Sequence, residues 1–295
     1  MIPNFLLLGV PRSGTTTIYE HLKQHPQIFL SSIKEPMFFI LEGEKETFPG
    51  PVSPKGPRNW KEYLSLFQDV RDEKAIGEAS IYYLFSPKAT LGIKKYIPDA
   101  KFVAIFRNPV DRAYSHFLHN RILGSEPIAD FEGAMAAEED RIGKGWFYFW
   151  SYRSIGFYGQ QIERCFSHFD PRQFRFFLFE DLLSNPERLF HEIFRFLEVD
   201  EMVRIPPLAR YNSSGIPRNR AVHEFLTKPN FFKSQLKRFL PRKTQYELMA
   251  NAMNRNLVKP TLPEETRRRI LAVYREDILK TQDLIHRDLS SWLSP

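Results

Sequence analysis

Short apolar segments alternate with segments of helical character along the first two hundred residues. Each apolar segment is bounded by Pro, Gly or polar residues, which is typical of a strand buried on both faces of a parallel sheet. Strands that alternate with helices predict an α/β fold, in which a central parallel sheet is flanked by helices on both faces. The predicted strand and helix pairs are residues 5–10 with 15–24, 101–106 with about 109–121, and 174–179 with about 186–197.

Three other segments are not expected to join the sheet. Residues 42–59 carry repeated Pro and Gly, residues 205–220 are basic and polar, and residues 228–263 mix Pro, Asn and aromatic side chains. These compositions are typical of excursions or lids that leave the main fold. A terminal helix is predicted over residues 266–284, which lack helix breakers.

The chain shows no internal repeat, no low-complexity tract and no long linker. We therefore predict one domain over residues 1–295. Its core is expected in about residues 1–200, and a closing loop with further helices in about residues 201–295.

The composition indicates the compartment in which the protein is expected to fold. The 295 residues are 42% hydrophobic, which is enough to bury a sizeable core. Cys165 is the only cysteine, which excludes an internal disulfide or a cysteine-based zinc site and favours a reducing compartment. No apolar run approaches the roughly 20 residues that span a bilayer, and residues 1–10 lack the basic start of a signal peptide. We expect a cytoplasmic protein without a membrane span.

The chain carries a formal net charge of +7, which indicates that it handles anions. Nucleic acid, a membrane surface, an acidic polysaccharide and a small phosphorylated cofactor all fit this charge, as does a basic solvated surface without function. No basic run with interleaved aromatics or known reader motif is present, so nucleic acid is not the expected partner.

Residues 9–16, Gly-Val-Pro-Arg-Ser-Gly-Thr-Thr, lie between the first predicted strand and its helix. They have the spacing of a phosphate-binding P-loop, but Thr15 stands where that motif has lysine. Glycines let backbone N–H groups turn toward an oxyanion, and a helix N-terminus adds positive partial charge. The segment therefore predicts a phosphate site, whereas the missing lysine argues against hydrolysis of ATP or GTP. An ordinary turn between strand and helix is the alternative.

A second motif follows the second predicted strand. Residues 107–115, Arg-Asn-Pro-Val-Asp-Arg-Ala-Tyr-Ser, place an arginine where the helix begins and a serine further along it. Ligands of open α/β sheets bind outside the carboxyl ends of the strands, so both motifs are expected to face one crevice. The alternative is that Arg107 and Arg112 are surface charges that pair with Asp111 or Glu126.

The two motifs together resemble the 5′-phosphosulfate loop and the 3′-phosphate motif of sulfotransferases that use 3′-phosphoadenosine 5′-phosphosulfate (PAPS). Residues 34–39, Lys-Glu-Pro-Met-Phe-Phe, and residues 179–186 are similar to stretches of the heparan sulfate branch and its bacterial relatives. The match covers most of residues 4–200. It implies a P-loop NTPase-like three-layer fold and an enzyme that takes PAPS, releases adenosine 3′,5′-bisphosphate and needs no metal.

The resemblance also implies roles for individual residues. Arg12 stands where most members have a lysine that contacts the leaving phosphate, and a guanidinium can neutralise the same developing charge. The other expected 5′-phosphate contacts are Ser13, Gly14, Thr15, Thr16 and Thr17. The expected 3′-phosphate contacts are Arg107 and Ser115, with Arg218 and Arg220 in a late loop that closes over the cofactor.

Glu35 matches the catalytic glutamate of the heparan sulfate branch, which implies that it takes the proton of the acceptor. The alternative is an acid at a helix start before Pro36. Lys34 either orients an anionic acceptor or is merely exposed. One departure is Ala79, because several relatives carry a lysine at that position.

These observations predict transfer of a sulfuryl group from PAPS to a hydroxyl or amine of a carbohydrate or small molecule, with Glu35 as general base and Arg12 as the second catalytic residue. A P-loop nucleotide kinase that uses ATP is the alternative enzyme. The sequence does not identify the acceptor or the oligomeric state, and its eight histidines are not assigned to catalysis or to a metal.

Overall fold

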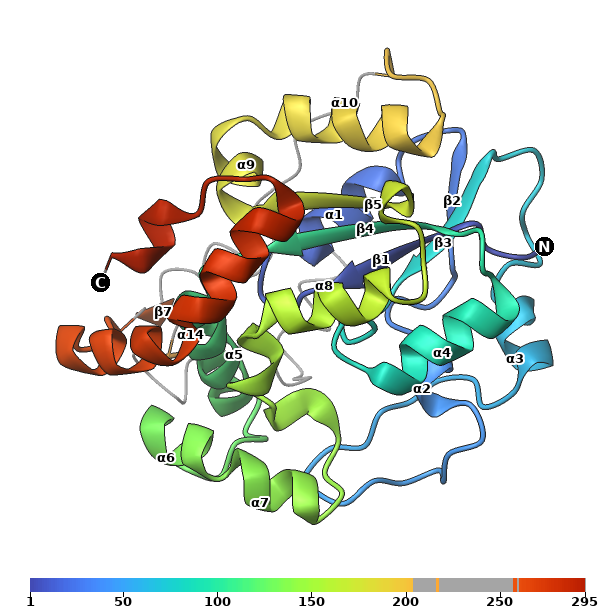
Figure 1. The fold of residues 1–295 in the computed structure, drawn as a ribbon. Helices are drawn as coiled ribbons and strands as arrows, with labels where there is room; N and C mark the ends of the chain where they lie inside the picture. Colours follow the sequence, from blue (N-terminus) through green and yellow to red (C-terminus); the bar gives the residue numbers. More distant parts are fainter. Residues whose placement is uncertain (204–215, 218–256, 259, 295) are drawn as a thin grey trace, which may run out of the picture.

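A five-stranded parallel sheet forms the centre of the molecule. The computed structural model describes residues 1–203, 216–217, 257–258 and 260–294. The strand order is β2-β3-β1-β4-β5, with every neighbouring pair parallel (Figure 1). The strands are β1 Phe5–Gly9, β2 Ile28–Leu30, β3 Ala75–Ala79, β4 Lys101–Phe106 and β5 Phe174–Leu178. This arrangement confirms the predicted α/β fold class.

The central strands are apolar because both of their faces are covered. In β1, Phe5 and Leu7 belong to one buried cluster, whereas Leu6 and Leu8 belong to a second cluster on the opposite face. All five residues of β1 are buried. Successive side chains of a strand point to opposite faces, so two covered faces require a continuous apolar run.

Helices cover each face of the sheet, which makes the three layers visible in Figure 1. Helices α1, α9 and α10 supply side chains to the cluster around Phe5. The larger cluster around Leu6 draws on most of the other helices. The first group is α1 Thr15–Leu22, α9 Phe179–Ser184 and α10 Pro186–Leu197; the second is α2 Phe38–Leu41, α3 Trp60–Ser65, α4 Pro87–Tyr96, α5 Pro109–Ile122, α6 Phe131–Ala136, α8 Tyr158–Phe166 and α14 Glu264–Ile285.

The remaining elements are short. Helix α7 spans Glu138–Gly143, and 3₁₀ turns lie at Tyr148–Trp150, Ser154–Gly156, Pro171–Gln173 and Ser290–Leu293. Strands β6 (Ile216–Pro217) and β7 (Leu257–Val258) pair with each other and not with the central sheet. Residues 42–59 contribute no strand, as expected of that excursion.

The last helix is attached to the body by buried polar contacts. Asp277 of α14 is buried and accepts hydrogen bonds from Gly159 N (2.9 Å) and Gln160 N (3.1 Å) at the start of α8. A carboxylate suits the positive end of a helix. Asn108 caps α5 and also donates to the carbonyl of Trp292 (3.2 Å), so the region after α14 contacts the second motif.

In the described part of the chain, none of the helices is both long and apolar enough to cross a membrane.

Candidate functional site

The two motifs lie at the same edge of the sheet. Strand β1 ends at Gly9 and strand β4 ends at Phe106, and the two strands pair with Gly9 opposite Ala104. The arrows of β1 and β4 point the same way in Figure 1, so residues 9–16 and 107–115 both leave the sheet at its carboxyl edge. The prediction that they share one edge is confirmed.

The loop after β1 prepares the start of α1 for an anion. Gly14 has φ 92°, and a Cβ there would lie 2.6 Å from Leu182 Cδ2, so only glycine fits. The first turn of α1 contains no acidic residue, and within the described residues no side chain caps it. Its first N–H groups are therefore available to an oxyanion, such as a phosphate.

Two guanidinium groups meet beside this loop. Arg12 Nε donates to Ser115 Oγ (3.2 Å), and Arg107 Nη1 donates to the carbonyl of Arg12 (3.2 Å). Burial, and then the charge of Arg107, lower the pKa of Arg12 to about 10. Burial also lowers the pKa of Arg107. Like charges held together in a partly buried place favour a bound anion.

Arg107 is held by two further contacts. Its guanidinium lies over the ring of Phe179 at 4.8 Å, and its carbonyl accepts from the hydroxyl of Tyr158 at 2.9 Å. Asn108, the next residue, accepts from Val110 N (3.0 Å) and caps α5. The second motif therefore has its arginine fixed at a helix start, with Ser115 buried further along the same helix.

The structure excludes the alternative in which Arg112 is a surface charge. It is fully buried, its Nη2 donates to the carbonyl of Tyr152, and its Nη1 lies 3.5 Å from Nδ1 of His116. His116 is also buried, in contact with the hydroxyl of Tyr82 at 3.3 Å. These side chains fix α5 against the segment around Tyr152.

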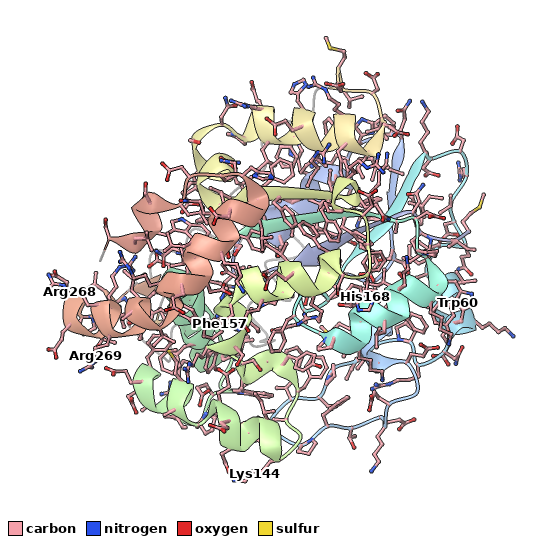
Figure 2. All side chains as sticks on the ribbon, in the orientation of Figure 1. Trp60, Lys144, Phe157, His168, Arg268 and Arg269 are labelled. Atoms are coloured by element: carbon pink, nitrogen blue, oxygen red, sulfur yellow. The ribbon has the colours of Figure 1, made fainter. Side chains whose placement is uncertain are left out.

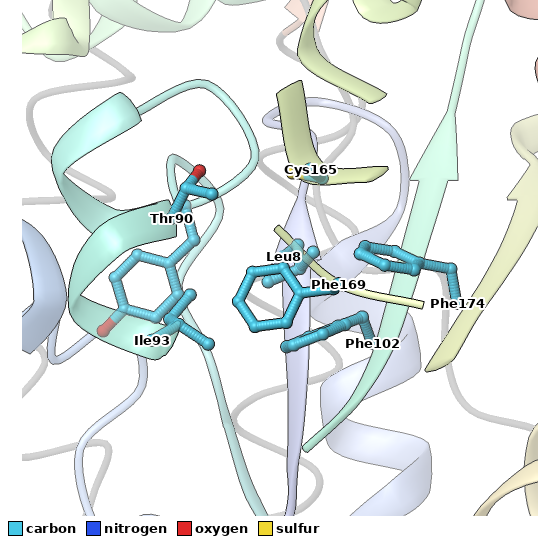
Figure 3. Close-up of a pocket in the computed structure, with 8 residues that line it drawn as sticks. Leu8, Thr90, Ile93, Phe102, Cys165, Phe169 and Phe174 are labelled. Carbon is cyan, nitrogen blue, oxygen red and sulfur yellow. The ribbon is translucent and has the colours of Figure 1, made fainter. Parts of the chain in front are cut away.

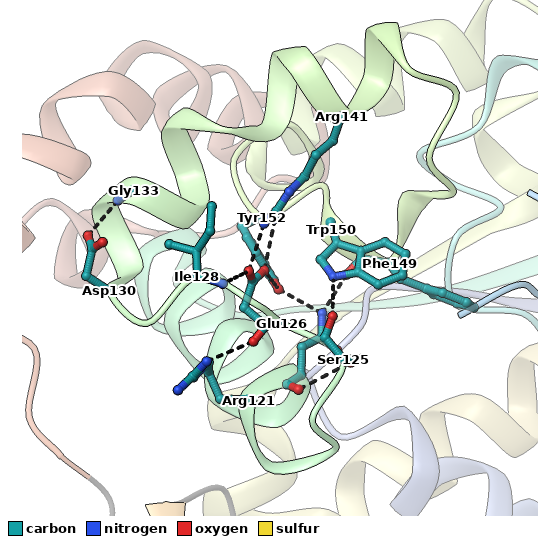
Figure 4. Close-up of polar contacts among 11 residues, drawn as sticks. Arg121, Ser125, Glu126, Ile128, Asp130, Gly133, Arg141, Phe149, Trp150 and Tyr152 are labelled. Carbon is teal, nitrogen blue, oxygen red and sulfur yellow. Dashed lines mark hydrogen bonds and ion pairs between the residues drawn. The ribbon is translucent and has the colours of Figure 1, made fainter. Parts of the chain in front are cut away.

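A buried network supports the other end of α5 (Figure 4). Glu126 receives two hydrogen bonds from Arg141 (2.9 and 2.7 Å) and one from the hydroxyl of Tyr152 (2.8 Å). Asn120 donates to the same hydroxyl (2.8 Å). Glu126 therefore pairs with Arg141 and not with the arginines of the second motif, in contrast to the alternative considered from the sequence.

Glu35 lies in a turn between β2 and α2 that approaches the phosphate loop. Lys34 Nζ donates both to Glu35 Oε1 (2.8 Å) and to Thr16 Oγ1 (3.0 Å). Glu35 has φ 61°, a left-handed conformation that costs on the order of 1 kcal/mol for a non-glycine residue. Helix α2 begins only at Phe38 and has no acidic residue in its first turn. Glu35 is therefore not an acid at a helix start.

The other predicted residues differ in exposure. Thr16 and Thr17 are partly exposed, whereas Ser13 and Thr15 are buried. Ser13 Oγ is buried and has no hydrogen-bond partner among the residues described. Ala79 is fully buried in β3, and its carbonyl accepts from Glu35 N (3.0 Å). Arg218 and Arg220 lie outside the described residues.

Two groups near this site were given no role from the sequence. Burial, and then the charges of Arg12 and Lys34, lower the pKa of His119 to about 4. Its spacing of one helical turn after Ser115 was the available signal. The second group is Glu78, a buried carboxylate in β3 next to the turn that carries Glu35.

The aromatic segment 146–150 is part of the core. A Cβ at Gly50 would lie 3.0 Å from Trp146 Cδ2, and the ring centroids of Phe48 and Phe147 are 5.2 Å apart. The segment therefore packs under the loop of residues 42–59. Trp150 is fully buried.

A narrow cavity lies between β1, β4, β5, α4 and α8 (Figure 3). Its walls include Leu8, Phe102, Phe169 and Phe174, with Cys165 at one side. Burial raises the pKa of the Cys165 thiol to about 11, which keeps it protonated and unreactive. The cavity is an apolar packing defect and does not belong to the site.

Several basic residues lie outside the two phosphate motifs. Figure 2 shows Arg268 and Arg269 at the outer end of α14 and Lys144 beyond α7. Each pairs with a carboxylate: Arg268 with Glu264, Arg269 with Glu132, and Lys144 with Asp140. These exposed pairs do not require a ligand. In the residues that the structure describes, no group of three or more His, Cys, Asp and Glu side chains is placed to hold a metal ion.

The donors at this edge fit a nucleotide that carries phosphates at two positions. The uncapped start of α1 with Thr16 supplies one set of donors, and Arg107 with Ser115 supplies a second set. Arg12 contacts Ser115 and so lies between them. Carboxylates near these donors include Glu35, which pairs with Lys34, and Asp111 and Glu180, whose charges act on Arg107.

Comparison with known proteins agrees with this geometry. Residues 3–277 match the family model described as sulfotransferase domain. Carbohydrate sulfotransferase 15 of Homo sapiens is 24% identical over 258 residues, covering 67% of this chain and 44% of the relative. Bifunctional heparan sulfate N-deacetylase/N-sulfotransferase 4 of Mus musculus is 24% identical over 304 residues, covering 99% of this chain and 31% of the relative. The chain thus spans less than half the length of these curated relatives.

A solved structure is similar over the whole length. The crystal structure of a sulfotransferase from Alicyclobacillus acidocaldarius matches with a TM-score of 0.77 and 28% identity, covering 99% of each chain. The family match covers far more than half of this chain. The protein therefore belongs to the sulfotransferase domain family, whose members use PAPS.

Proposed function

We propose that this chain transfers the sulfuryl group of PAPS to a hydroxyl or amine of a carbohydrate or small molecule, and that Glu35 is the general base. One observation carries the proposal. Lys34 joins Thr16 of the phosphate loop to Glu35, while Arg12 joins the same loop to Ser115 of the second motif. A phosphate loop, a second cationic motif and a carboxylate thereby form one connected group.

Bound PAPS supplies the sulfuryl group, which leaves the 5′-phosphate as the acceptor oxygen or nitrogen forms its bond to sulfur. Glu35 accepts the proton that the acceptor loses. The Arg12 guanidinium stabilises the negative charge that grows on the leaving phosphate oxygen. Arg107 and Ser115 hold the 3′-phosphate, which distinguishes PAPS from ATP. The remaining donors are the N–H groups at the start of α1 and the hydroxyls of Thr16 and Thr17.

The nucleotide kinase alternative is not retained. The chain belongs to the sulfotransferase family, and Thr15 stands where a P-loop kinase needs the lysine that contacts its β- and γ-phosphates. The names of the relatives, which include carbohydrate and heparan sulfate sulfotransferases, support the carbohydrate class of acceptor.

The test is Glu35→Gln, measured with labelled PAPS and a panel of carbohydrate and small-molecule acceptors. We expect kcat to fall by roughly 10²- to 10⁴-fold, the usual contribution of a general base. The Kd of adenosine 3′,5′-bisphosphate stays within about twofold, because Glu35 is not among its proposed contacts. Glu44→Gln, at an exposed carboxylate in the loop after α2, is the control and keeps the wild-type rate. A normal rate for Glu35→Gln would remove Glu35 from the mechanism.

A further inference from the structure

Glu78 is buried in an unusual place for a carboxylate. It lies inside β3, it is 0% exposed, and three hydroxyl groups surround it. Ser80 Oγ donates to Glu78 Oε2 (2.7 Å), the hydroxyl of Tyr63 donates to Oε1 (3.3 Å), and the hydroxyl of Tyr83 forms a further hydrogen bond. An ionised carboxylate accepts hydrogen bonds and donates none, so in the ionised form of Glu78 these hydroxyl protons are directed toward it.

Two of these hydroxyls have a second partner, one in the turn that carries Glu35 and one in the first turn of α2. Once its proton points at Glu78, Ser80 Oγ is free to accept, and it does so from Met37 N at 2.9 Å. The hydroxyl of Tyr83 likewise accepts from Phe39 N at a longer 3.4 Å. Glu78 is thus linked through single hydroxyl groups to the backbone just after Glu35.

The turn needs such support because its backbone is strained. Glu35 and Met37 have φ values of 61° and 53°, which side chains other than glycine rarely adopt. On its other side the turn is tied to β3 by Glu35 N, which donates to the carbonyl of Ala79 (3.0 Å). Strain of this kind persists only where surrounding contacts over-determine the conformation.

We propose that Glu78 is a positioning residue that holds the Glu35 turn through the hydroxyls of Ser80 and Tyr83. The proposal rests on the proposed role of Glu35 as base. Glu78 does not touch the acceptor or PAPS in this account. It orients two hydroxyls, and these set the backbone from which the Glu35 carboxylate reaches the acceptor.

The electrostatics of the group show two opposing effects. Burial, and to a smaller extent the charge of Glu35, raise the pKa of Glu78 to about 7, whereas hydrogen bonds from the hydroxyls of Tyr83, Ser80 and Tyr63 oppose this rise. The hydroxyls thus stabilise the ionised form and offset part of the cost of burial.

The test compares two buried serines that each accept a backbone N–H. Ser80→Ala removes the acceptor of Met37 N, whereas Ser86→Ala removes the acceptor of Ala89 N (3.2 Å) at the start of α4. Each variant removes two contacts of a buried hydroxyl: Ser80→Ala also loses the hydrogen bond to Glu78 (2.7 Å), and Ser86→Ala also loses the contact with the hydroxyl of Tyr148 (3.4 Å). We expect kcat to fall about tenfold in Ser80→Ala and to stay within about twofold in Ser86→Ala, because only the first misplaces the base. Binding of adenosine 3′,5′-bisphosphate is expected to change less than twofold in both.

Further variants keep the test decisive. Tyr83→Phe and Glu78→Gln remove other contacts that support the same turn, and we expect them to lower kcat in the same way. Ser80→Thr keeps the hydroxyl, so we expect its kcat to stay near that of the wild type. Adding Ser80→Ala to Glu35→Gln should slow the enzyme no further, because both changes act on one group.

Two failures are distinguishable. If Glu35→Gln is slow but Ser80→Ala, Tyr83→Phe and Glu78→Gln all turn over normally, the positioning role is wrong and the proposed function stands. If Glu35→Gln itself turns over normally, the assignment of the base is wrong, and the positioning role falls with it.

Discussion

Two neighbouring regions of the molecule concentrate opposite charges. After β1 and β4, Arg12 and Arg107 are brought together, and the charge of Arg107 helps to lower the pKa of Arg12. In the turn before α2 and in β3, Glu35 and Glu78 are brought together, and the charge of Glu35 helps to raise the pKa of Glu78. Both regions also contain a non-glycine residue at positive φ, Arg12 in the first and Glu35 in the second.

The difference lies in what relieves each charge. Glu78 receives three hydroxyl groups from the protein itself, so the acidic region is satisfied before any ligand arrives. Arg12 donates to a serine hydroxyl and Arg107 donates to a carbonyl, while the negative charges of Asp111 and Glu180 oppose the lowering of the pKa of Arg107. The hydroxyls around Glu78 suit the acidic region to hold a base in place, whereas two adjacent guanidinium groups favour a bound anion.

The largest expected effect concerns the cationic region. Arg12→Ala should lower kcat by about a thousandfold, because removing one group that stabilises developing charge commonly costs 10²- to 10³-fold or more. Arg12→Lys keeps the charge and should recover turnover to within about tenfold of wild type. Steady-state kinetics with PAPS as the varied substrate measure both. An Arg12→Lys variant as slow as Arg12→Ala would show that the guanidinium geometry, and not its charge, is required.

The next effect concerns stability in the acidic region. Folding raises the pKa of Glu78 from 4.5 to about 7, so the folded protein binds more protons than the unfolded chain between these pH values. The free energy of unfolding therefore falls as the pH rises through this window and levels off above pH 7. Glu78→Gln removes the ionisable group and with it this pH dependence. Between pH 5 and pH 8 the free energy of unfolding of the variant should therefore fall by roughly 2–3 kcal/mol less than that of the wild type. Urea unfolding at both pH values measures the difference, and parallel pH curves would contradict it.

A third prediction returns to the cationic region. Arg107→Ala should weaken binding of adenosine 3′,5′-bisphosphate by about 30-fold, since a hydrogen bond to a charged group is worth roughly 1.5–3 kcal/mol. Binding of adenosine 5′-phosphate, which lacks the 3′-phosphate, should change less than threefold. Isothermal titration calorimetry separates the two ligands. Arg172→Ala, at an exposed arginine paired with Asp170, is the control. Equal losses for both ligands would place Arg107 away from the 3′-phosphate.

The smallest expected effect lies between the two regions. Lys34 contacts Thr16 on one side and Glu35 on the other, and its side chain is 26% exposed. Such a pair contributes little in water, so Lys34→Gln should change the free energy of unfolding by less than about 0.5 kcal/mol. Thermal unfolding with and without salt measures this. A loss well above 1 kcal/mol would mean that the two regions depend on each other for folding.

The cationic and the acidic regions also differ in how far the sequence could predict them. Strand β1 is a continuous apolar run, β4 is apolar after Lys101, and β5 is apolar except for Arg175. The carboxyl ends of parallel strands share one edge, so both phosphate motifs could be placed together from sequence. Strand β3 was missed because Gly77 and Glu78 interrupt its apolar pattern. The burial of Glu78 depends on hydroxyls from α3 and from the segment after β3, which no local pattern reveals.

The contacts of individual arginines also escaped prediction. Arg107 and Arg112 look alike in sequence, but Arg107 lies over Phe179 whereas Arg112 is fully buried against Tyr152. Arg107 precedes α5 whereas Arg112 lies within it, and the packing partners of both come from distant parts of the chain. The sequence allowed two interpretations of Lys34. Its contact with Thr16 joins two segments that only the folded sheet brings together.

The bond between Asn108 and the carbonyl of Trp292 has a consequence for biosynthesis. It joins residues 184 positions apart, and Asn108 is the cap of the helix that begins beside Arg107. A nascent chain that has emerged only as far as α10 can pair all five strands of the sheet, yet it lacks this contact. The side chain of Asn108 can therefore gain this partner only after residue 292 has been synthesised.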